Sequence, residues 1–423
     1  MHSYLPRIYD KLLKERLEAS GAVLVEGTKW CGKTTTCTQA AKSVLYMADP
    51  ESREQNLILA DAQPSALLDG KTPRLIDEWQ TAPKLWDAVR STVDQRDDFG
   101  QFILTGSSVP PDNSEMFHTG TGRISRLRMR PMSLYESGDS SGAVSLGDLF
   151  DGAKLPVAKS GTTLERLAFL LCRGGWPKAV GQPERIALRQ ARDYVDAVTD
   201  SDISRADNTQ RDPHLARRLL RSYARMESSQ SPTAHIAADL RGNGTTPSDK
   251  TVQSYITALQ RIFVVEDMPA WNPNLRSKTA IRTADTRHFV DPSIAAAALG
   301  VGPEGALKDL ETFGLWFESM CVRDLRVYAD ALDGEVFHYR DKSGLECDAV
   351  VHLRDGRYGL VEVKLGGDRL VGEGAESLLA LAKKIDTTRM PAPSFTMVLT
   401  GTGALSYTRP DGVMVVPLAT LKD

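Results

Sequence analysis

The clearest chemistry in this sequence lies between Gly27 and Thr34. These eight residues match the phosphate-binding pattern G-x-x-x-x-G-K-[ST] in full. Glycines in such a loop let backbone N–H groups turn onto the phosphates of a nucleotide. Lys33 is expected to reach the β- and γ-phosphates, and Thr34 is expected to ligate Mg²⁺. The residues expected to bind ATP are Gly27, Thr28, Lys29, Trp30, Cys31, Gly32, Lys33, Thr34 and Thr35.

The segments around this loop are the ones that its chemistry needs. Residues 22–26 form an apolar run rich in β-branched side chains, which predicts a buried strand. Residues 35–43 favour a helix, whose positive N-terminal end would point at the phosphates. A chance turn in front of a helix is the alternative, and the strand before the loop argues against it. Residues 44–48 predict a second strand, so the chain begins as an α/β sheet.

Two acids end the next predicted strand, in residues 74–80. Ligands of parallel nucleotide-binding sheets lie at the carboxyl ends of the strands, where Asp77 and Glu78 would stand. Asp77 is expected to hold Mg²⁺ through its water shell, and Glu78 is expected to polarise the attacking water. The alternative is a solvated strand end followed by a helix N-terminus, which also favours acids.

A further predicted strand, residues 102–108, ends in small hydroxyl side chains. Thr105 or Ser107 could hydrogen-bond the attacking water or the γ-phosphate. Arg123 follows two loop glycines and could stabilise charge on the transferring phosphoryl group, either in its own chain or from a neighbouring subunit. A structural role for Arg123 at the surface is an equal alternative.

The bulk numbers set outer limits on the molecule. A chain of 423 residues is long enough for two to four domains, and its net charge of −3 gives no chain-wide basic signature. Any nucleic-acid surface must therefore be a local patch. Five cysteines without a C-x-x-C pair indicate neither a zinc site nor a disulfide framework, which predicts a reducing cytoplasm. No signal peptide or membrane span is indicated.

Composition and periodicity divide the chain into four parts. Residues 1–136 predict a P-loop domain with a parallel sheet, and residues 137–160, rich in small polar residues, predict a linker. Residues 161–285 are mostly helical. Helices at 234–240 and 249–262, a turn at 241–244 and a strand at 263–267 resemble a winged helix-turn-helix, with a packing scaffold as an equal alternative. Residues 286–423 form the last part.

This last part contains a second set of candidate residues. Glu318 lies on or beside the buried face of a long helix, and two strands follow, 345–353 and 357–364. A two-residue turn between the strands would place Asp348 opposite Val363 and send Glu362 to the other face. A three-residue turn with a left-handed Gly356 would instead set Asp348 opposite Glu362.

On the second register, Asp348, Glu362 and Lys364 share one face of the sheet, and Glu318 can approach from the helix. Such a cluster could bind one or two Mg²⁺ ions, mainly through Asp348 and Glu362, and lower the pKa of a bound water. Lys364 would orient the nucleophile or stabilise charge on the phosphorane. The alternative is an exposed sheet face with cross-strand ion pairs.

These motifs carry a family resemblance over nearly the whole chain. The N-terminal 136 residues resemble bacterial and archaeal AAA-type ATPases, in which G-x-x-x-x-G-K-T, Asp-Glu-x-Gln and Thr-Gly-Ser follow in that order. The remainder is similar to the DUF4143-like domain that accompanies such ATPases. Within it, Glu318, Asp348 and Glu362-Val363-Lys364 match the E…D…E-x-K pattern of PD-(D/E)XK nuclease folds. For Arg123, the resemblance implies a candidate arginine finger.

The resemblance and the residues together imply an α/β protein with an N-terminal P-loop NTPase, a middle helical or winged-helix region and a C-terminal restriction-endonuclease-like domain. The expected ligands are ATP and Mg²⁺, and the expected partners are DNA and a second copy of the chain. One hypothesis is an ATPase whose nuclease-like domain acts on or binds DNA under nucleotide control. The other is an ATP-operated switch whose C-terminal domain binds DNA or protein without cleavage.

Overall fold

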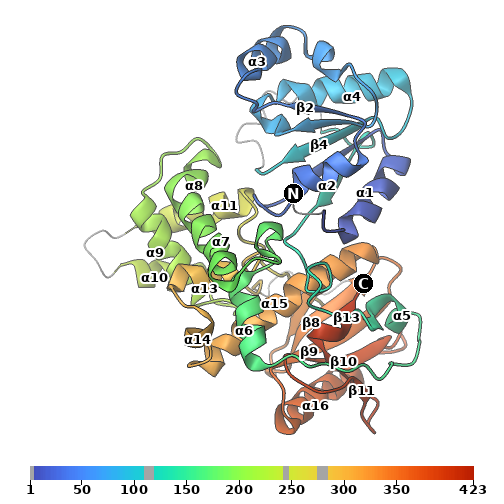
Figure 1. The fold of residues 1–423 in the computed structure, drawn as a ribbon. Helices are drawn as coiled ribbons and strands as arrows, with labels where there is room; N and C mark the ends of the chain where they lie inside the picture. The colour runs from blue at the N-terminus through green and yellow to red at the C-terminus, as the bar shows by residue number, and fades with distance from the viewer. Residues whose placement is uncertain (1–3, 109–118, 242–246, 274–283) are drawn as a thin grey trace. The chain divides into compact units, whose positions relative to one another are not determined.

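The computed structural model describes residues 4–108, 119–241, 247–273 and 284–423. The chain forms two compact units that are discontinuous in sequence (Figure 1). The N-terminal unit comprises residues 1–131, 200–211 and 257–264, and the C-terminal unit comprises residues 132–199, 212–256 and 265–423. No helix in the described ranges is long and apolar enough to cross a membrane.

The N-terminal unit is built on a five-stranded sheet, and its strands are parallel, as predicted. The strand order is β2-β3-β4-β1-β5. The bounds are β1 Ala22–Glu26, β2 Ser43–Tyr46, β3 Arg74–Asp77, β4 Phe102–Gly106 and β5 Ile124–Arg128. Because all strands are parallel, their carboxyl ends meet at one edge of the sheet. The loop after β1, the acids after β3 and the hydroxyls at the end of β4 therefore lie at the same edge.

Helices cover both faces of this sheet (Figure 1). Their bounds are α1 Ile8–Ala19, α2 Lys33–Ala40, α3 Arg53–Ala62, η1 Pro64–Leu68, η2 Trp79–Thr81 and α4 Lys84–Arg96. The short helix α8 (Ile203–Arg205) also belongs to this unit. Alternate apolar residues of β1 and β4 pack with α3, η1 and α4 in one core that includes Leu24, Leu104 and the contacting indole rings of Trp79 and Trp86, which are tilted by 37°. α1 and α2 pack against each other and against β1.

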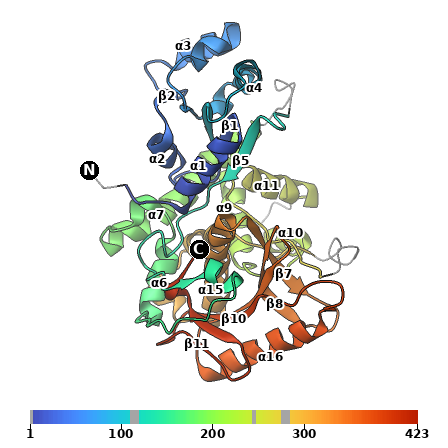
Figure 2. The ribbon, with the colours of Figure 1, turned by 90° about the vertical axis from the view of Figure 1, so that its right-hand side faces the viewer.

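The C-terminal unit contains a six-stranded mixed sheet in the order β11-β12-β10-β9-β8-β7. Its strands are β7 Gly334–Arg340, β8 Glu346–Leu353, β9 Tyr358–Lys364, β10 Phe395–Thr400, β11 Tyr407–Thr408 and β12 Met414–Pro417. β7, β8 and β9 are antiparallel, whereas β9, β10 and β12 are parallel. The strands lie between the long helices α15 (Leu310–Ala331) and α16 (Asp368–Lys384), as Figures 1 and 2 show.

A helical layer precedes this sheet in sequence. Its helices are α6 Leu164–Arg173, η3 Pro177–Ala179, α7 Glu184–Ala197, η4 Val198–Asp202, α9 Pro213–Ala224, α10 Thr233–Leu240, α11 Asp249–Arg261, α13 Ser293–Leu299 and α14 Pro303–Ala306. α13 packs against α6, α7 and α9. The predicted helices at 234–240 and 249–262 are therefore present as α10 and α11.

The predicted winged helix does not form as expected. Residues 263–267 are not a strand; within them Val265 makes a single bridge with Phe289, and Met268, just after them, makes another with Thr286. Most of the predicted turn at 241–244 lies outside the described residues. Residues 257–261, the last part of α11, belong to the N-terminal unit, whereas α10 and the first part of α11 belong to the C-terminal unit.

The predicted linker at 137–160 is also wrong, because much of it is structured. Residues 144–150 form β6 (Val144–Ser145) and α5 (Leu146–Phe150), and β6 pairs with β13 (Leu421–Lys422) near the chain end. The Ser140 hydroxyl donates to Leu421 O over 2.7 Å. Only residues 151–157 are largely exposed. Small polar residues here satisfy buried backbone groups as well as forming loops.

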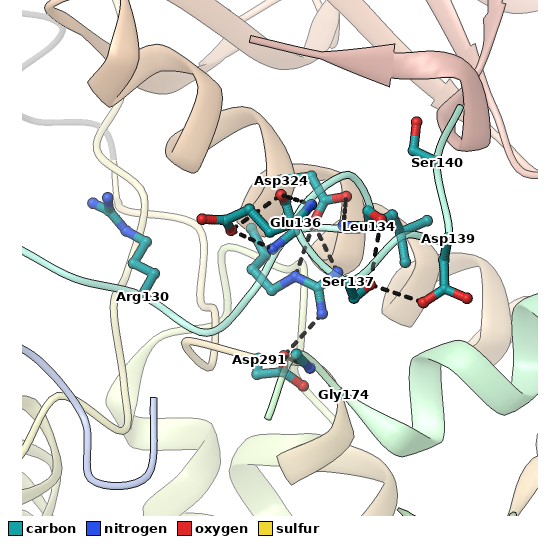
Figure 3. A network of polar contacts seen from close by, with 12 residues as sticks. Arg130, Leu134, Glu136, Ser137, Asp139, Ser140, Gly174, Asp291 and Asp324 are labelled. Carbon is teal, nitrogen blue, oxygen red and sulfur yellow. Dashed lines mark hydrogen bonds and ion pairs between the residues drawn. The ribbon is translucent and has the colours of Figure 1, made fainter. Parts of the chain in front are cut away.

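A buried charge network fixes the segment just before the predicted linker (Figure 3). Asp324 accepts a hydrogen bond from Leu134 N at 2.9 Å and pairs with Arg323, which also pairs with Asp291. Burial raises the pKa of the Asp324 carboxyl, and the Arg323 guanidinium partly offsets this. Arg173 pairs with Asp139 nearby. Substituting one partner of such a buried ion cluster destabilises the fold, because the remaining buried charge is then unpaired.

Candidate functional site

The phosphate loop lies between the end of β1 and the start of α2, as the sequence predicted. Gly27 has φ +154°, and a Cβ there would lie 2.1 Å from the Met129 carbonyl oxygen. Gly32 has φ +100° and forms the N-cap of α2. Both positions therefore require glycine, one because of a close backbone approach and both because of left-handed φ values.

Lys33 is held at the loop itself. Its side chain is buried, and its ammonium donates to Gly27 O at 2.9 Å and to Thr28 O at 2.8 Å. These two carbonyls belong to the first half of the loop. The positive charge of Lys33 is thus fixed beside the backbone that would surround a phosphate.

The remaining loop residues have different surroundings. Thr28 and Cys31 are buried, and the Cys31 thiol donates to Met129 O at 3.5 Å. Lys29 forms an ion pair with Asp202 at 2.6 Å, inside the N-terminal unit. Trp30 is exposed with a positive φ of 66°, and Thr35 is exposed at the start of α2.

Three predicted residues meet beside the loop. Asp77 ends β3, and β4 lies between β3 and β1 in the sheet. The Thr34 hydroxyl donates to Asp77 Oδ1 at 2.7 Å, and the Thr105 hydroxyl donates to the same oxygen at 2.6 Å. The phosphate-loop threonine, the strand-end acid and the hydroxyl of the next strand therefore form one hydrogen-bonded group.

Glu78 is held next to this group in an unusual backbone conformation. Its φ is 57°, which is uncommon for a residue other than glycine and is often found at functional sites. Its N–H donates to Thr105 Oγ1 at 3.2 Å, and its carboxylate accepts from Ser107 Oγ at 3.1 Å. Gln80 also donates to this carboxylate, at 2.5 Å. No role for Gln80 was predicted from the sequence, although this residue stands in the Asp-Glu-x-Gln pattern.

Arg123 is not among the side chains brought to this group. It directly precedes β5, and its carbonyl accepts from Ala22 N at 3.0 Å, at the amino end of β1. The phosphate loop follows the carboxyl end of β1, at the other edge of the sheet. Arg123 instead pairs with Asp94 at 2.6 Å. A role in its own chain is not supported by this position, and a role from a second copy stays a prediction.

The second predicted cluster depends on the turn between β8 and β9. Leu353 N donates to Arg357 O at 2.8 Å, and Gly356 has φ +92°. The strands pair in the same register from His352 with Tyr358 to Ala349 with Val361. Continuing this register by one residue places Asp348 opposite Glu362. The three-residue turn of the two alternatives is therefore the one present.

Lys364 joins the two acids of this hairpin. Its ammonium lies 2.6 Å from Glu362 Oε2 and 3.4 Å from Asp348 Oδ2. Asp348 Oδ2 also accepts from Val363 N at 2.7 Å, and Ser377 of α16 donates to Glu362 Oε1 at 3.3 Å. The side chains of Asp348, Glu362 and Lys364 therefore meet, as the shared-face register required.

Charge in this cluster is only partly balanced. Burial raises the pKa of Glu362 to about 8, with a further increase from the Asp348 charge and an opposing effect of Lys364. Burial also raises the pKa of Glu318, on α15, well above its ordinary value, and Asp348 and Glu362 add to it. For Lys364, burial would lower the pKa, but the two acids beside it raise it overall. Glu318 thus belongs electrostatically to the same cluster.

A metal ion at the phosphate loop or at the β8–β9 hairpin would need oxygen, nitrogen or sulfur ligands from the side chains there. In the part of the chain that the structure describes, no three acidic, histidine or cysteine side chains are grouped closely enough to hold a metal ion. Mg²⁺ is usually held by one or two carboxylates together with water and substrate phosphates. Thr34 with Asp77, and Asp348 with Glu362, both offer oxygen donors of this kind.

Three family models match successive parts of the chain. Residues 19–137 match the family model of the AAA domain, residues 164–305 match a domain of unknown function (DUF8612), and residues 313–421 match another (DUF4143). Uncharacterized proteins of Mycobacterium tuberculosis and Mycobacterium bovis are each 22% identical over 355 residues, which cover 83% of this chain and 72% of the relative.

Among solved structures, the Walker-type ATPase of Pyrococcus abyssi is similar with a TM-score of 0.43 and 15% sequence identity, over 70% of this chain and 96% of that one. The motif geometry and the AAA match together define the class. The N-terminal part of the chain is an AAA-type nucleotide-binding ATPase domain, and it is fused to a DUF4143 domain.

Proposed function

We propose that the N-terminal unit hydrolyses ATP with Mg²⁺ and that this reaction controls a nuclease-like C-terminal domain that acts on or binds DNA. The observation that carries the first part is the Asp77 carboxylate oxygen that accepts from both Thr34 and Thr105 beside the phosphate loop. Thr34 and Asp77 would hold Mg²⁺, which when bound neutralises charge on the β- and γ-phosphates. The donor set fits this ion because both side chains offer oxygen.

The other residues have separate roles in the proposed reaction. Lys33 supplies positive charge to the β- and γ-phosphates from its place at the loop. Glu78 orients and polarises the attacking water. Gln80 and Ser107 hold the Glu78 carboxylate, which fixes its direction but also occupies one of its oxygens. Glu78 can therefore activate a water only if its Oε2 is released from these two bonds or if its Oε1 is used instead.

The C-terminal part of the proposal is carried by the contact of Lys364 with Glu362 and its proximity to Asp348. Two carboxylates beside one ammonium suit a scissile phosphodiester, because the acids would hold Mg²⁺ and the ammonium would favour the developing negative charge. Glu318 adds a further carboxyl that can take up or release a proton. Plasmid DNA is a suitable substrate for an assay of this cleavage.

The alternative is an ATP-operated switch whose C-terminal domain binds DNA or protein without cleavage. It is favoured by the same ion pairs, because an ammonium bonded to its neighbouring carboxylates can also be a structural feature. One preparation of the full chain tests both readings. ATP turnover is measured alongside plasmid nicking with Mg²⁺ or Mn²⁺, with and without ATP. If ATP is hydrolysed but the plasmid is nicked under none of these conditions, the result supports the switch. If no ATP is hydrolysed, the result contradicts the ATPase assignment.

A further inference from the structure

A buried arginine near the start of the chain contacts the phosphate loop. Arg7 precedes α1 and is 5% exposed. One guanidinium nitrogen donates to the carbonyl of Cys31, inside the loop, at 2.7 Å. Another donates to the carbonyl of Arg130, after β5, at 2.8 Å. The side chain thus ties the phosphate loop to a segment about a hundred residues away in sequence, and no loop motif includes it.

The direction of one peptide group follows from this contact. A trans peptide is planar, so the C=O of one residue and the N–H of the next point in opposite directions. Because the Cys31 carbonyl points at Arg7, the Gly32 N–H points away from Arg7. The carbonyls of Gly27 and Thr28 are taken by Lys33, and the Gly32 carbonyl accepts from Thr36 N in α2. Arg7 therefore satisfies a loop carbonyl that Lys33 does not reach.

We propose that Arg7 is a positioning residue for nucleotide binding. It holds the Cys31–Gly32 peptide in the orientation that offers the Gly32 N–H to a phosphate, and its buried charge adds positive potential behind the loop. The inference deepens the proposed ATPase function and depends on it. Two further contacts join the loop to the segment that contains Arg130. Gly27 lies against the Met129 carbonyl oxygen, and the Cys31 thiol donates to that same oxygen.

The role requires arginine rather than any cation. The planar guanidinium presents several donors in a fixed fork, and here two of them serve two carbonyls that belong to different segments. A lysine ammonium keeps the charge but is a single point on a flexible stem. Arg7→Lys should therefore keep the buried charge and lose one of the two bridges.

The neighbouring residues provide a matched control. The Tyr4 hydroxyl donates to Asp10 Oδ1 at 2.5 Å and contacts the Thr36 hydroxyl at 3.1 Å, while Arg7 N donates to Asp10 Oδ2 at 2.8 Å. These bonds attach residues 4–10 to α2 without contacting the loop carbonyl. Tyr4→Phe loosens the same segment and leaves the guanidinium contacts in place.

The experiment compares Mg-ADP affinity by calorimetry in the full chain. We expect Arg7→Lys to bind about tenfold more weakly, the scale of one hydrogen bond to a charged group, and Tyr4→Phe to bind like wild type. With Arg7→Ala, added ethylguanidinium should restore part of the affinity and ethylammonium should not. Equal affinity of wild type and Arg7→Lys, or an equal loss in Tyr4→Phe, overturns the inference. A wild-type protein that binds no nucleotide overturns the proposed function instead.

A second measurement needs no variant, so it applies even if Arg7 substitutions prevent folding. Hydrogen exchange by mass spectrometry is followed over peptides that contain Gly32, with and without Mg-ADP. We expect ADP to slow exchange at the Gly32 amide, because that N–H would gain a phosphate acceptor. Unchanged exchange at Gly32 in a protein that demonstrably binds ADP contradicts the proposed peptide orientation.

Discussion

The two candidate sites of this chain are held together in different ways. At the phosphate loop, the Asp77 carboxylate is bonded by two neutral hydroxyls, and Lys33 is bonded by backbone carbonyls. At the C-terminal hairpin, the carboxylates of Asp348 and Glu362 share one ammonium, and a third acid, Glu318, adds repulsion. The first site is a set of neutral and backbone contacts around single charges, whereas the second is a group of interacting charges.

This difference has a physical consequence. Hydroxyls and carbonyls keep their hydrogen bonds over a wide range of pH, so the first site should keep its geometry when the pH changes. A cluster of interacting acids changes its charge with pH and with cation binding. The first site is therefore expected to respond to nucleotide, and the second to respond to protons and metal ions. Variants at each site test whether the two sites differ in this way.

The largest expected effect is at the phosphate loop. Lys33→Ala removes the ammonium that we propose binds the β- and γ-phosphates and should lower kcat/KM for ATP by about a thousandfold, the upper scale for losing one preorganised charge-stabilising donor. Steady-state phosphate release measures this. The exposed Lys42, just after α2, gives a matched lysine-to-alanine control that should retain wild-type turnover. Undiminished hydrolysis by Lys33→Ala would remove the basis of the assignment.

The next largest effect tests whether the second site cleaves DNA. If the hairpin cleaves DNA, Lys364→Ala should slow plasmid nicking on the order of a few hundredfold, because it removes charge stabilisation at the phosphodiester. ATP turnover should not change. Lys383, exposed near the end of α16, is the control. Nicking that survives Lys364→Ala at the wild-type rate would make this site an ion-pair cluster and favour the switch.

A smaller effect separates the two acids after β3. Glu78→Gln keeps the shape of the side chain but cannot polarise water, so ATP hydrolysis should slow about a hundredfold while ATP binding persists. Asp77→Asn should instead raise the Mg²⁺ concentration that turnover requires. Single-turnover hydrolysis and nucleotide binding are measured on both variants. Normal turnover by Glu78→Gln would show that its bonds to Gln80 and Ser107 reflect a structural role.

The phosphate loop could be located from local patterns, because strand, loop and helix follow one another within a few residues. Asp77 and Thr105 could be placed beside it because they lie at the carboxyl ends of parallel strands of the same sheet. The second site was harder, since Asp355-Gly356 suits turns of either two or three residues. The structure has the three-residue turn, in which Asp355 accepts from Arg357 N at 2.9 Å and Gly356 takes a left-handed conformation. The alternation of the strands then places Asp348 and Glu362 together without further information.

Other features had no local signal. Residues 200–211 and 257–264 join the N-terminal unit from distant parts of the chain, and the Lys29 partner Asp202 lies there. Arg7 is a single arginine before an amphipathic helix, and nothing in its neighbourhood marks the loop carbonyl that it contacts. Long-range pairing of this kind depends on the complete fold, so a pattern read along the sequence cannot find it.

The smallest expected effect concerns protons at the second site. Glu362 has a pKa of about 8, raised by burial and by Asp348 on β8 and opposed by Lys364 on its own strand and Ser377 on α16. A cation that binds there must displace the proton. Apparent Mn²⁺ affinity should therefore rise about tenfold per pH unit below pH 8 and level off above it. Titrations without nucleotide, followed by the signal of free Mn²⁺, measure this, and Glu362→Gln should flatten the dependence.

The pH dependence of folding stability gives an independent test of the raised pKa of Glu362. An acid whose folded pKa is raised from about 4.3 in the unfolded chain holds its proton more tightly when folded, so its contribution to the free energy of unfolding falls as pH rises from about 4.3 to about 8. The difference in Tm between Glu362→Gln and wild type should grow in favour of the variant over this range and then stay constant. The buried Glu227, whose pKa is also raised to about 8, is common to both proteins and cancels. Parallel Tm curves would mean that Lys364 keeps Glu362 ionised at neutral pH, and the contrast between the two sites would then rest on metal binding alone.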